Sequence, residues 1–478
     1  MPFLSIEFAF AFLIFFLLYW LCAPKPALQN GLLLFAGLGL LAYVSVPAML
    51  TVVAFSLLTS CIAVGLSHSS RQGVRKTWLA AGIVAALANL SFFKYYDFFR
   101  PALQQYLGGE AADILMPLGV SYYTFQAIAY LVSLYRRGDV RLRWYDLLLH
   151  FSFFPTITSG PIIRAGSFKS AVGVQQGISS QIQTTSRRSI IRPALAVGLI
   201  LLGVSKKWWL AGTLADGWVD PVFENPMQYD IVAVLTAMYG YTAQLFLDFS
   251  GYSDLVIGLA MLLGFQLPQN FNMPLRAFNI RDFWDRWHIT LSTWIRDYIY
   301  IPLGGSRGGF TRTQINLLIA MVLSGIWHGS GWNFLLWGLL HGVALVLLNI
   351  GDKIVGRREA LASTKIGKFI GVLVTVNFVC AAFVVFRTTS LDDAALMFQA
   401  LWYNPNPAAL PALDVLAVLA LMVLSLLFYG LLTKGFRGFV AMLEKMPVWL
   451  WALPVAAVMV LLMVLAPSGI PGFIYANF

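Results

Sequence analysis

Apolar runs that approach the length of a transmembrane helix recur along the whole chain. They lie around residues 4–23, 31–48, 49–67, 78–96, 114–135, 190–205, 231–265, 314–330, 332–350, 368–387, 412–432 and 447–467. Because a helix needs roughly 20 apolar residues to cross the core of a bilayer, the pattern predicts an all-α polytopic membrane protein with about 11 to 12 transmembrane helices. The run at 231–265 is too long for one simple span, and part of it is expected to fold back.

Glycine, proline or a charged residue interrupts several of these runs. Such interruptions are tolerated where a helix lines a cavity or packs inside the protein, so re-entrant or interfacial helices are expected beside the spans. The sequence shows neither a fixed-period repeat nor the two related halves of many secondary transporters. A single integral domain over residues 1–478 is therefore expected.

The chain carries a net charge of +11, and its charged residues are segregated along the sequence. Basic clusters occupy 71–76, 136–143, 164–192, 276–312 and 352–359, whereas acidic residues gather at 215–230 and 391–393. The positive-inside rule places the basic loops in the cytoplasm and the N-terminus and acidic loops outside. Topology accounts for the charge, and no nucleic-acid partner is expected. Lys206 and Lys207 do not fit, because this topology puts them at an outer exit.

Composition agrees with the polytopic class, since 59% of the residues are hydrophobic and 11% are charged. The three cysteines, Cys22, Cys61 and Cys380, each lie in an apolar run without a CxxC pair or a neighbouring histidine. This arrangement argues against a disulfide framework, a zinc site and a thiol nucleophile. No metal site is predicted.

Two carboxylates stand close together in the stretch "FLDFSGYSDL", residues 246–255. Asp248 and Asp254 bracket Ser250, Gly251 and Ser253 at the edge of an apolar run. Asp and Ser cap exposed amides where a helix begins, so a helix break with capping residues is the favoured interpretation. A contact with substrate is the alternative, because ionisable groups in a membrane often serve function.

A second charged and aromatic segment follows at "RDFWDRWHITLSTWIRDYIYIPLGGSRGG", residues 281–309. Helical spacing places Trp287, Leu291, Trp294 and Tyr298 on one apolar stripe, with flanking charges that include Arg296. The pattern predicts a helix at the membrane surface, with its tryptophans at headgroup depth.

His288 lies at the border of this stripe. It either points inward along a wet cavity or is an interfacial histidine bonded to a carboxylate. The sequence leaves both interpretations open.

Two further histidines lie inside apolar runs, in "LSGIWHGSGWNFLLWGLLHG" at residues 323–342. An ionisable side chain in such a setting is by default a functional hypothesis. A buried imidazole favours its neutral form, and a neutral imidazole can take a proton from a hydroxyl. For His328 this role and an interhelical hydrogen bond both remain open, whereas for His341 the hydrogen bond is favoured.

These motifs, in this order, resemble the bacterial branch of the membrane-bound O-acyltransferase family, and most of all its members that acetylate alginate and other exopolysaccharides. The resemblance rests on "AQLFLDFSGYSDLVIGLAMLLGF", "FWDRWHITLSTWIRDYIYIPLGGSRGG" and "GIWHGSGWNFLLWGLLHG". It extends to the earlier stretches "MPLGVSYYTFQAIAYLVSLYR" (116–136) and "FFPTITSGPIIR" (153–164). The motif-rich core covers residues 92 to about 345.

The resemblance implies many helices around a central tunnel, which joins a cytoplasmic donor entrance to an outer acceptor site. His328 of the family's "WHG" element and His288 of its "RWH" element are the implied catalytic pair. Residues assigned to substrate or donor binding are Trp287, Trp294, Arg296, Tyr298, Trp327 and Asp254. No bound cofactor is expected, and the acyl thioester donor is acetyl-CoA or an acylated carrier protein.

The implied activity is transfer of an acyl group, most simply acetyl, from a cytoplasmic thioester to a hydroxyl of an extracytoplasmic polysaccharide, directly or through a periplasmic partner. The expected location is the bacterial cytoplasmic (inner) membrane. Expected partners are the donor or its carrier protein, periplasmic polysaccharide-modifying proteins and membrane lipid. Two alternatives remain, namely D-alanyl transfer towards teichoic acid and a polysaccharide transporter or export channel. The missing repeat symmetry and the histidine-centred motifs argue against the channel.

Overall fold

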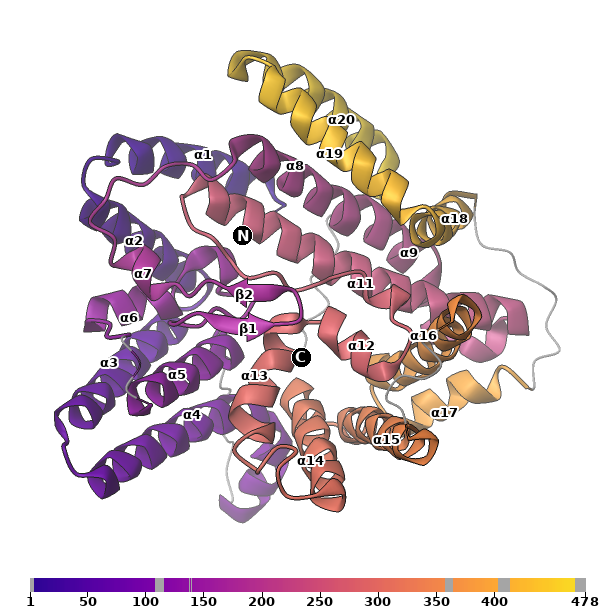
Figure 1. Ribbon diagram of the computed structural model, residues 1–478. Helices are drawn as coiled ribbons and strands as arrows, with labels where there is room; N and C mark the ends of the chain where they lie inside the picture. The colour runs from indigo at the N-terminus through magenta and orange to yellow at the C-terminus, as the bar shows by residue number, and fades with distance from the viewer. Residues whose placement is uncertain are drawn as a thin grey trace. The chain divides into compact units, whose positions relative to one another are not determined.

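A computed structural model describes residues 4–107, 116–136, 138, 140–356, 364–402 and 413–468. Within these residues nearly all regular structure is helical (Figure 1). The strands found there are β1 (Phe168–Ser170) and β2 (Gly173–Gln175), which form an antiparallel hairpin with Phe168 opposite Gln175. The predicted all-α class is confirmed.

The chain divides into two compact units. The first comprises residues 1–193 and 259–269, and the second comprises residues 194–258 and 270–478. The single domain expected over residues 1–478 stays a prediction.

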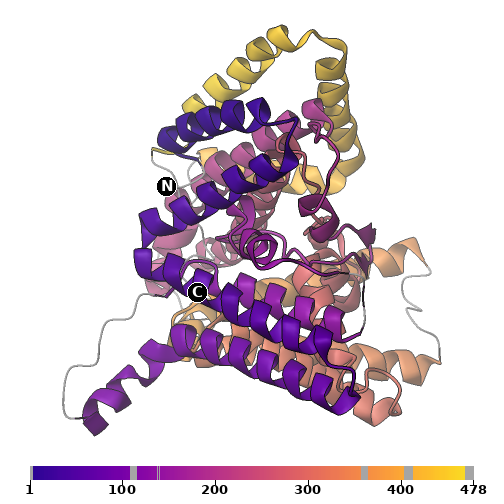
Figure 2. The same ribbon diagram turned by 90° about the vertical axis from the view of Figure 1, so that its left-hand side faces the viewer.

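The first unit is built from the N-terminal helices α1 (Ile6–Leu21), α2 (Pro26–Val44), α3 (Val46–His68), α4 (Gln72–Leu107), α5 (Val120–Tyr135), α6 (Trp144–Phe151) and α7 (Ser179–Ile182). Proline stands in the first turn of α2 and of α3, where a missing N–H costs no helical hydrogen bond. The Ser45 hydroxyl accepts the Ala48 N–H and caps α3. Figure 2 shows α3, α4 and α5 packed side by side.

Almost all residues of the remaining helices belong to the second unit. In chain order they are α8 (Pro193–Val204), α9 (Gly212–Leu214), α10 (Asp220–Glu224), α11 (Ile231–Leu262), α12 (Ile280–Arg286), α13 (Ile289–Ile295), α14 (Phe310–His328), α15 (Trp332–Val355), α16 (Lys365–Arg387), α17 (Leu391–Gln399), α18 (Leu413–Leu427), α19 (Tyr429–Lys445) and α20 (Ala452–Leu465). Wider π-helical turns at Ser205–Ala211 and Ala215–Val219 join α8, α9 and α10 into one helix, Pro193–Glu224.

The described part of the chain contains eight helices that are long and apolar enough to cross a membrane. The bent pair Val415–Leu424 and Tyr429–Lys445 raises the number to nine if it forms one span. This is fewer than the approximately 11 to 12 spans expected from the sequence. Among the expected spans, α1 and α5 have only 16 residues each, and α14 includes the polar residues Arg312, Gln314 and Asn316. The protein is a multi-pass membrane protein with short helices beside its spans.

The apolar run at 231–265 forms one unbroken helix, α11, of 32 residues. The expected fold-back of this run is wrong. In its most apolar 18-residue window, 83% of the residues are buried inside the protein. Protein rather than lipid covers most of this helix, so its length need not match the thickness of a bilayer.

Candidate active site

His328 is the last residue of α14, where the helix gives way to the extended residue Gly329. Helix α15 begins four residues later, at Trp332, and runs back along α14. Gly325 and Gly338 are the point of closest approach. A Cβ added to Gly325 would overlap the Phe334 carbonyl oxygen, and one added to Gly338 would overlap the Met321 carbonyl oxygen. Gly325 and Gly338 therefore let α15 pack closely against α14, which sets His328 against the first turns of α15.

Aromatic rings surround the His328 imidazole. The ring of Trp337 on α15 lies 5.0 Å away at 86°, and that of Phe386 on α16 lies 5.0 Å away at 83°. The neighbouring Trp327 ring lies at 4.6 Å. His328 is only 3% exposed, so aromatic rings rather than water surround most of this imidazole.

His288 occupies a break between α12 and α13. Its backbone is left-handed, with φ 41° and ψ 54°, a conformation that is uncommon for any residue other than glycine. Asn270 fixes the chain after the break. The Ile289 N–H donates to the Asn270 carbonyl oxygen at 2.9 Å, and the Thr290 hydroxyl donates to its Oδ1 at 2.9 Å. Such strained residues persist only where their surroundings hold them, often at functional sites.

The His288 side chain is buried, with 1% exposure, and neither ring nitrogen has a hydrogen-bond partner among the described residues. The carboxylate partner allowed for by the sequence is therefore not found there. Its ring packs edge-on to Phe249 of α11, with centroids 4.8 Å apart. Burial lowers the pKa of His288, which lies outside the candidate spans, to about 3. The imidazole is neutral at physiological pH, and its nitrogens remain open to a polar group of a substrate.

Trp327 lies between the two implied catalytic histidines. Its ring centroid is 6.5 Å from that of His288 and 4.6 Å from that of His328. The two imidazoles come from elements 40 positions apart in the sequence, yet they contact the same indole. The structure thus brings His288, His328 and Trp327 into one cluster within the second unit.

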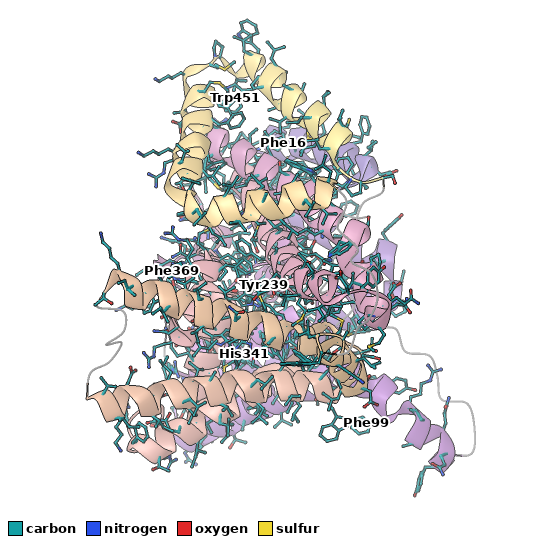
Figure 3. The ribbon with its side chains drawn as sticks, turned by 90° about the vertical axis from the view of Figure 1, so that its right-hand side faces the viewer. Phe16, Phe99, Tyr239, His341, Phe369 and Trp451 are labelled. Atoms are coloured by element: carbon teal, nitrogen blue, oxygen red, sulfur yellow. The ribbon has the colours of Figure 1, made fainter. Side chains whose placement is uncertain are left out.

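His341 continues this cluster along α15. Its ring lies 4.8 Å from Trp337, 5.1 Å from Trp284 and 5.3 Å from Phe378, and it is fully buried where α15 faces α16 (Figure 3). Neither of its ring nitrogens has a hydrogen-bond partner among the described residues, so the favoured interhelical hydrogen bond is not found there. Packing against aromatic rings takes its place.

The predicted aromatic stripe does not form. Trp287 lies beyond the end of α12 in an extended conformation, and the left-handed His288 separates it from Trp294 on α13. Both tryptophans are buried in the protein, at 2% and 4% exposure, rather than displayed at headgroup depth. The prediction of a continuous interfacial helix is therefore wrong, because the hydrogen bonds to Asn270 redirect the chain at His288.

The other residues assigned to donor binding lie at the end of this segment. Trp294 packs against Tyr298, with ring centroids 5.1 Å apart. Arg296 pairs with Asp297 at 2.7 Å and leaves 43% of its side chain exposed. Residues 296–300 form a π-helical turn, a feature that often marks functional sites.

The two aspartates of α11 form ion pairs with the two lysines that conflicted with the topology. Lys206 Nζ lies 2.7 Å from Asp254 Oδ2, and Lys207 pairs with Asp248 in a buried contact. The predicted helix break with capping aspartates is wrong, because α11 continues through both residues. Pairing lowers the cost of burying each charge. It therefore explains why lysines occur in one of these neighbouring apolar helices and aspartates in the other.

Sequence reasoning missed the residues that support the histidines. Phe249 follows the paired Asp248 and contacts His288, and Phe386 closes the enclosure around His328. Glycines at 203 and 251 let α8 approach α11, because a Cβ on Gly203 would meet the Gly251 carbonyl oxygen at 2.5 Å. Lysines in one apolar run and aspartates in another were the signal in the sequence for the contact between α8 and α11. Nothing in the local sequence marks Phe386.

Comparison with known proteins assigns the part of the chain that contains this site to a protein family. The family described as MBOAT, membrane-bound O-acyltransferase, matches residues 141–391, which include all three clustered histidines. The chain is 32% identical to a peptidoglycan O-acetyltransferase of Helicobacter pylori, over 81% of this chain and 77% of that protein. It is 34% identical to a probable alginate O-acetylase of Pseudomonas aeruginosa, over 90% of this chain and 82% of that protein.

A teichoic acid D-alanyltransferase of Bacillus subtilis is 29% identical over 57% of this chain and 69% of that protein. The relatives thus include transferases with different acyl groups and different acceptors. Their names have in common the acylation of a polymer, which is peptidoglycan, alginate or teichoic acid.

Proposed function

Because the chain belongs to the membrane-bound O-acyltransferase family and is an O-acyltransferase, we propose that it transfers an acetyl group from a cytoplasmic thioester to an extracytoplasmic polysaccharide hydroxyl. The two relatives that align over most of the chain are named for O-acetyl transfer, which favours acetyl over D-alanyl. The proposed location is the bacterial inner membrane, where cytoplasmic donor and outer acceptor can reach one protein.

The observation that carries this proposal is the enclosure of His328 by Trp327, Trp337 and Phe386, with His288 on the other side of Trp327. A general base works best when it is held rigidly and kept from water. Rings on three sides fix the imidazole. His328 is the last residue of α14, so the extended residue Gly329 follows it beside the site.

In the proposed reaction a ring nitrogen of His328 takes the proton of a sugar hydroxyl as its oxygen attacks the thioester carbonyl carbon. A C–O bond forms, the C–S bond breaks, and the departing thiolate receives the proton. The products are an O-acyl ester and a free thiol. A neutral His288 donates a ring N–H to the carbonyl oxygen as negative charge develops there.

Acetyl-CoA or an acylated carrier protein is the proposed donor. Its approach is assigned to the segment around the exposed Arg296 and the half-buried Tyr298, where a basic side chain can meet phosphate or an acidic carrier. This segment is positioned by the buried side chains of Trp287, Trp294 and Trp327. Asp254 contributes to donor binding through its ion pair with Lys206. A periplasmic polysaccharide-modifying protein is the proposed partner on the outer side.

The test replaces His328 with alanine and measures the ester content of the purified polysaccharide. Loss of a positioned base typically lowers a rate by about a hundredfold to ten-thousandfold, so His328→Ala should leave polymer without acyl groups. His150→Ala is the matched control, because it removes an equally buried imidazole from α6 in the first unit. The control should retain acylation at comparable protein levels in the membrane.

The released acid separates the alternatives. Acetate from wild-type polymer supports the proposal, whereas D-alanine supports the sister activity of the teichoic acid relatives. Polymer that is retained in the His328→Ala cells would favour an export channel. Normal acyl content in the His328→Ala polymer would contradict His328 as the base.

A further inference from the structure

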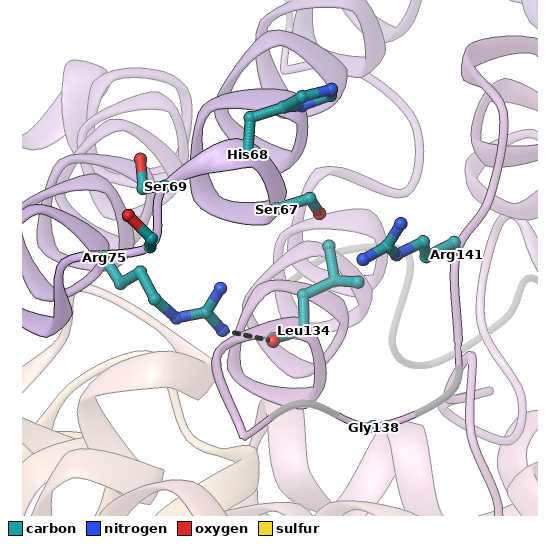
Figure 4. A pocket seen from close by; sticks show the side chains of 8 residues that line it. Ser67, His68, Ser69, Arg75, Leu134, Gly138 and Arg141 are labelled. Atoms are coloured by element: carbon teal, nitrogen blue, oxygen red, sulfur yellow. Dashed lines mark hydrogen bonds between the residues drawn. The ribbon is translucent and has the colours of Figure 1, made fainter.

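A polar cavity lies in the first unit, between the turn that joins α3 to α4 and the end of α5. Its volume is about 620 Å³ (Figure 4). Two arginines, Arg75 and Arg141, line it together with His68 and serine side chains, and no carboxylate is found among the described residues of its lining. The cavity thus joins the basic clusters at 71–76 and 136–143, which the sequence assigned independently to the cytoplasmic side.

Arg75 is a built-in part of the cavity wall. It is 8% exposed, and its guanidinium donates to the carbonyl oxygens of Leu66 at 2.7 Å and of Leu134 and Tyr135 at 2.9 Å. These acceptors lie in the last turns of α3 and α5, where carbonyl groups lack helical partners. Arginine has five N–H donors. Those on Nε and the second on Nη1 have no acceptor among the described residues, so a buried cation faces the cavity with donors to spare.

Arg141 supplies a second cation at the rim. Its backbone is held by Gln183, whose Nε2 donates to the Arg141 carbonyl oxygen at 2.6 Å, while its guanidinium makes no ion pair within the described part of the chain. His68 donates from Nδ1 to the Val64 carbonyl oxygen at 3.0 Å, which leaves Nε2 for another partner. Two guanidinium groups, with no carboxylate in the described lining, form the chemistry that binds phosphate oxygens.

The surroundings favour a lipid as the source of that phosphate. On the helices that flank the cavity, Val64 is 57% exposed, Val74 is 43% exposed and Trp78 is 38% exposed. Exposed aliphatic side chains next to a cationic pocket match the two parts of a phospholipid, and tryptophan is enriched at headgroup depth. Basic pockets on the cytoplasmic side of membrane proteins bind anionic head groups.

We propose that this cavity binds the phosphate of an anionic phospholipid from the cytoplasmic leaflet. The site lies in the first unit, whereas the histidine cluster lies in the second, and its occupancy does not depend on the acyl transfer proposed above. Arg75 and Arg141 hold the phosphate oxygens, and the exposed side chains of α3 and α4 contact the acyl chains.

The test uses the full-length protein in detergent and measures its unfolding temperature as phosphatidylglycerol is added. Arg141→Gln should raise the half-saturating lipid concentration by about tenfold, since a charge-assisted hydrogen bond to phosphate is lost. Lys76→Gln is the control. It removes the same charge from an exposed position of α4 that does not line the cavity, and it should bind as wild type does. Arg75→Gln should weaken binding as well, but it also removes bonds that hold α3 and α5.

Equal lipid affinity for Arg141→Gln and wild type would overturn the proposal. So would an equal loss in Lys76→Gln, because it would indicate diffuse attraction to a basic surface. Sodium phosphate serves as the soluble probe. If it protects the protein in an Arg141-dependent manner while phosphatidylglycerol does not, the lipid assignment fails and the ligand is a soluble phosphate.

Discussion

His288 combines a left-handed backbone with a buried side chain that has no hydrogen-bond partner within the described residues. Each feature alone costs free energy, since strained dihedrals cost on the order of 1 to 3 kcal/mol and an unpaired buried polar group costs a similar amount. A side chain without polar atoms would avoid the second of these costs. The choice of histidine is therefore better explained by a reacting partner that completes its hydrogen bonds.

The pKa of His288 predicts how stability depends on pH. The folded value is lowered to about 3, whereas an unfolded histidine titrates near about 6.5, so the unfolded chain binds the extra proton between these values. The contribution of His288 to the free energy of unfolding is complete above a pH of about 6.5 and declines as the pH falls below that value. Wild type should therefore lose more unfolding temperature between pH 8 and pH 5 than His288→Asn, because asparagine tolerates the left-handed backbone but does not titrate.

The comparison with His288→Asn isolates this residue, because the other four histidines are the same in both proteins. His288→Asn should also fold, insert and show little or no acyl transfer. Parallel pH profiles of unfolding in the two proteins would contradict the buried, neutral state of His288.

At the scale of elements, the sequence predicted the helices better than the breaks within them. Apolar runs mark where helices form, because burial or lipid contact acts on each run locally. The break at His288 depends on Asn270, 18 positions earlier, and the α8–α11 contact depends on Lys207 and Asp248, 41 positions apart. Pairings between residues so far apart leave no pattern within a short stretch of sequence. The spacing of Trp287 and Trp294 even fits a continuous helix, so periodicity alone predicts the wrong element there.

The approach of α14 to α15 predicts a positional effect on catalysis. Gly325→Ala should sharply reduce acyl transfer, because the new Cβ must displace the Phe334 backbone and with it Trp337, which encloses His328. Gly351→Ala, near the end of α15, is the control, since an added Cβ there meets nothing within 4 Å. It should be nearly silent. If both variants keep wild-type rates at equal membrane levels, the close approach does not position His328.

At the scale of the whole molecule, ion pairs within the second unit agree with the predicted sidedness of its loops. Asp352, near the end of α15, pairs with Arg281, and both belong to segments assigned to the cytoplasm. At the opposite end of α16, Arg387 pairs with Asp220 of the acidic segment assigned to the outside. The ion pairs thus mark the end of α15 assigned to the cytoplasm and the end of α16 assigned to the outside, as the predicted topology requires.

Cysteine labelling tests this orientation. In a protein whose three native cysteines are replaced by serine, a single cysteine at Asp392 should react with a membrane-impermeant reagent in intact cells. One at Lys353 should react only after the membrane is opened. Both positions are exposed, at the start of α17 and the end of α15. The reverse pattern would invert the topology. Residues 357–359 of the neighbouring basic cluster lie outside the described residues.

The paired lysines and aspartates also bear on how the chain enters the bilayer during synthesis. Two lysines near the middle of a helix add about 5 to 7 kcal/mol to the cost of its insertion, and two aspartates on α11 add a comparable amount. Joined as Lys206–Asp254 and Lys207–Asp248, the four charges have no net charge. In a translocon assay, residues 193–224 alone should insert less well than their Lys206→Met, Lys207→Met double variant, and residues 193–262 together should remove the difference. That outcome would mean that the earlier helix waits at the translocon for its partner, and that biogenesis proceeds by helix pairs rather than by single segments.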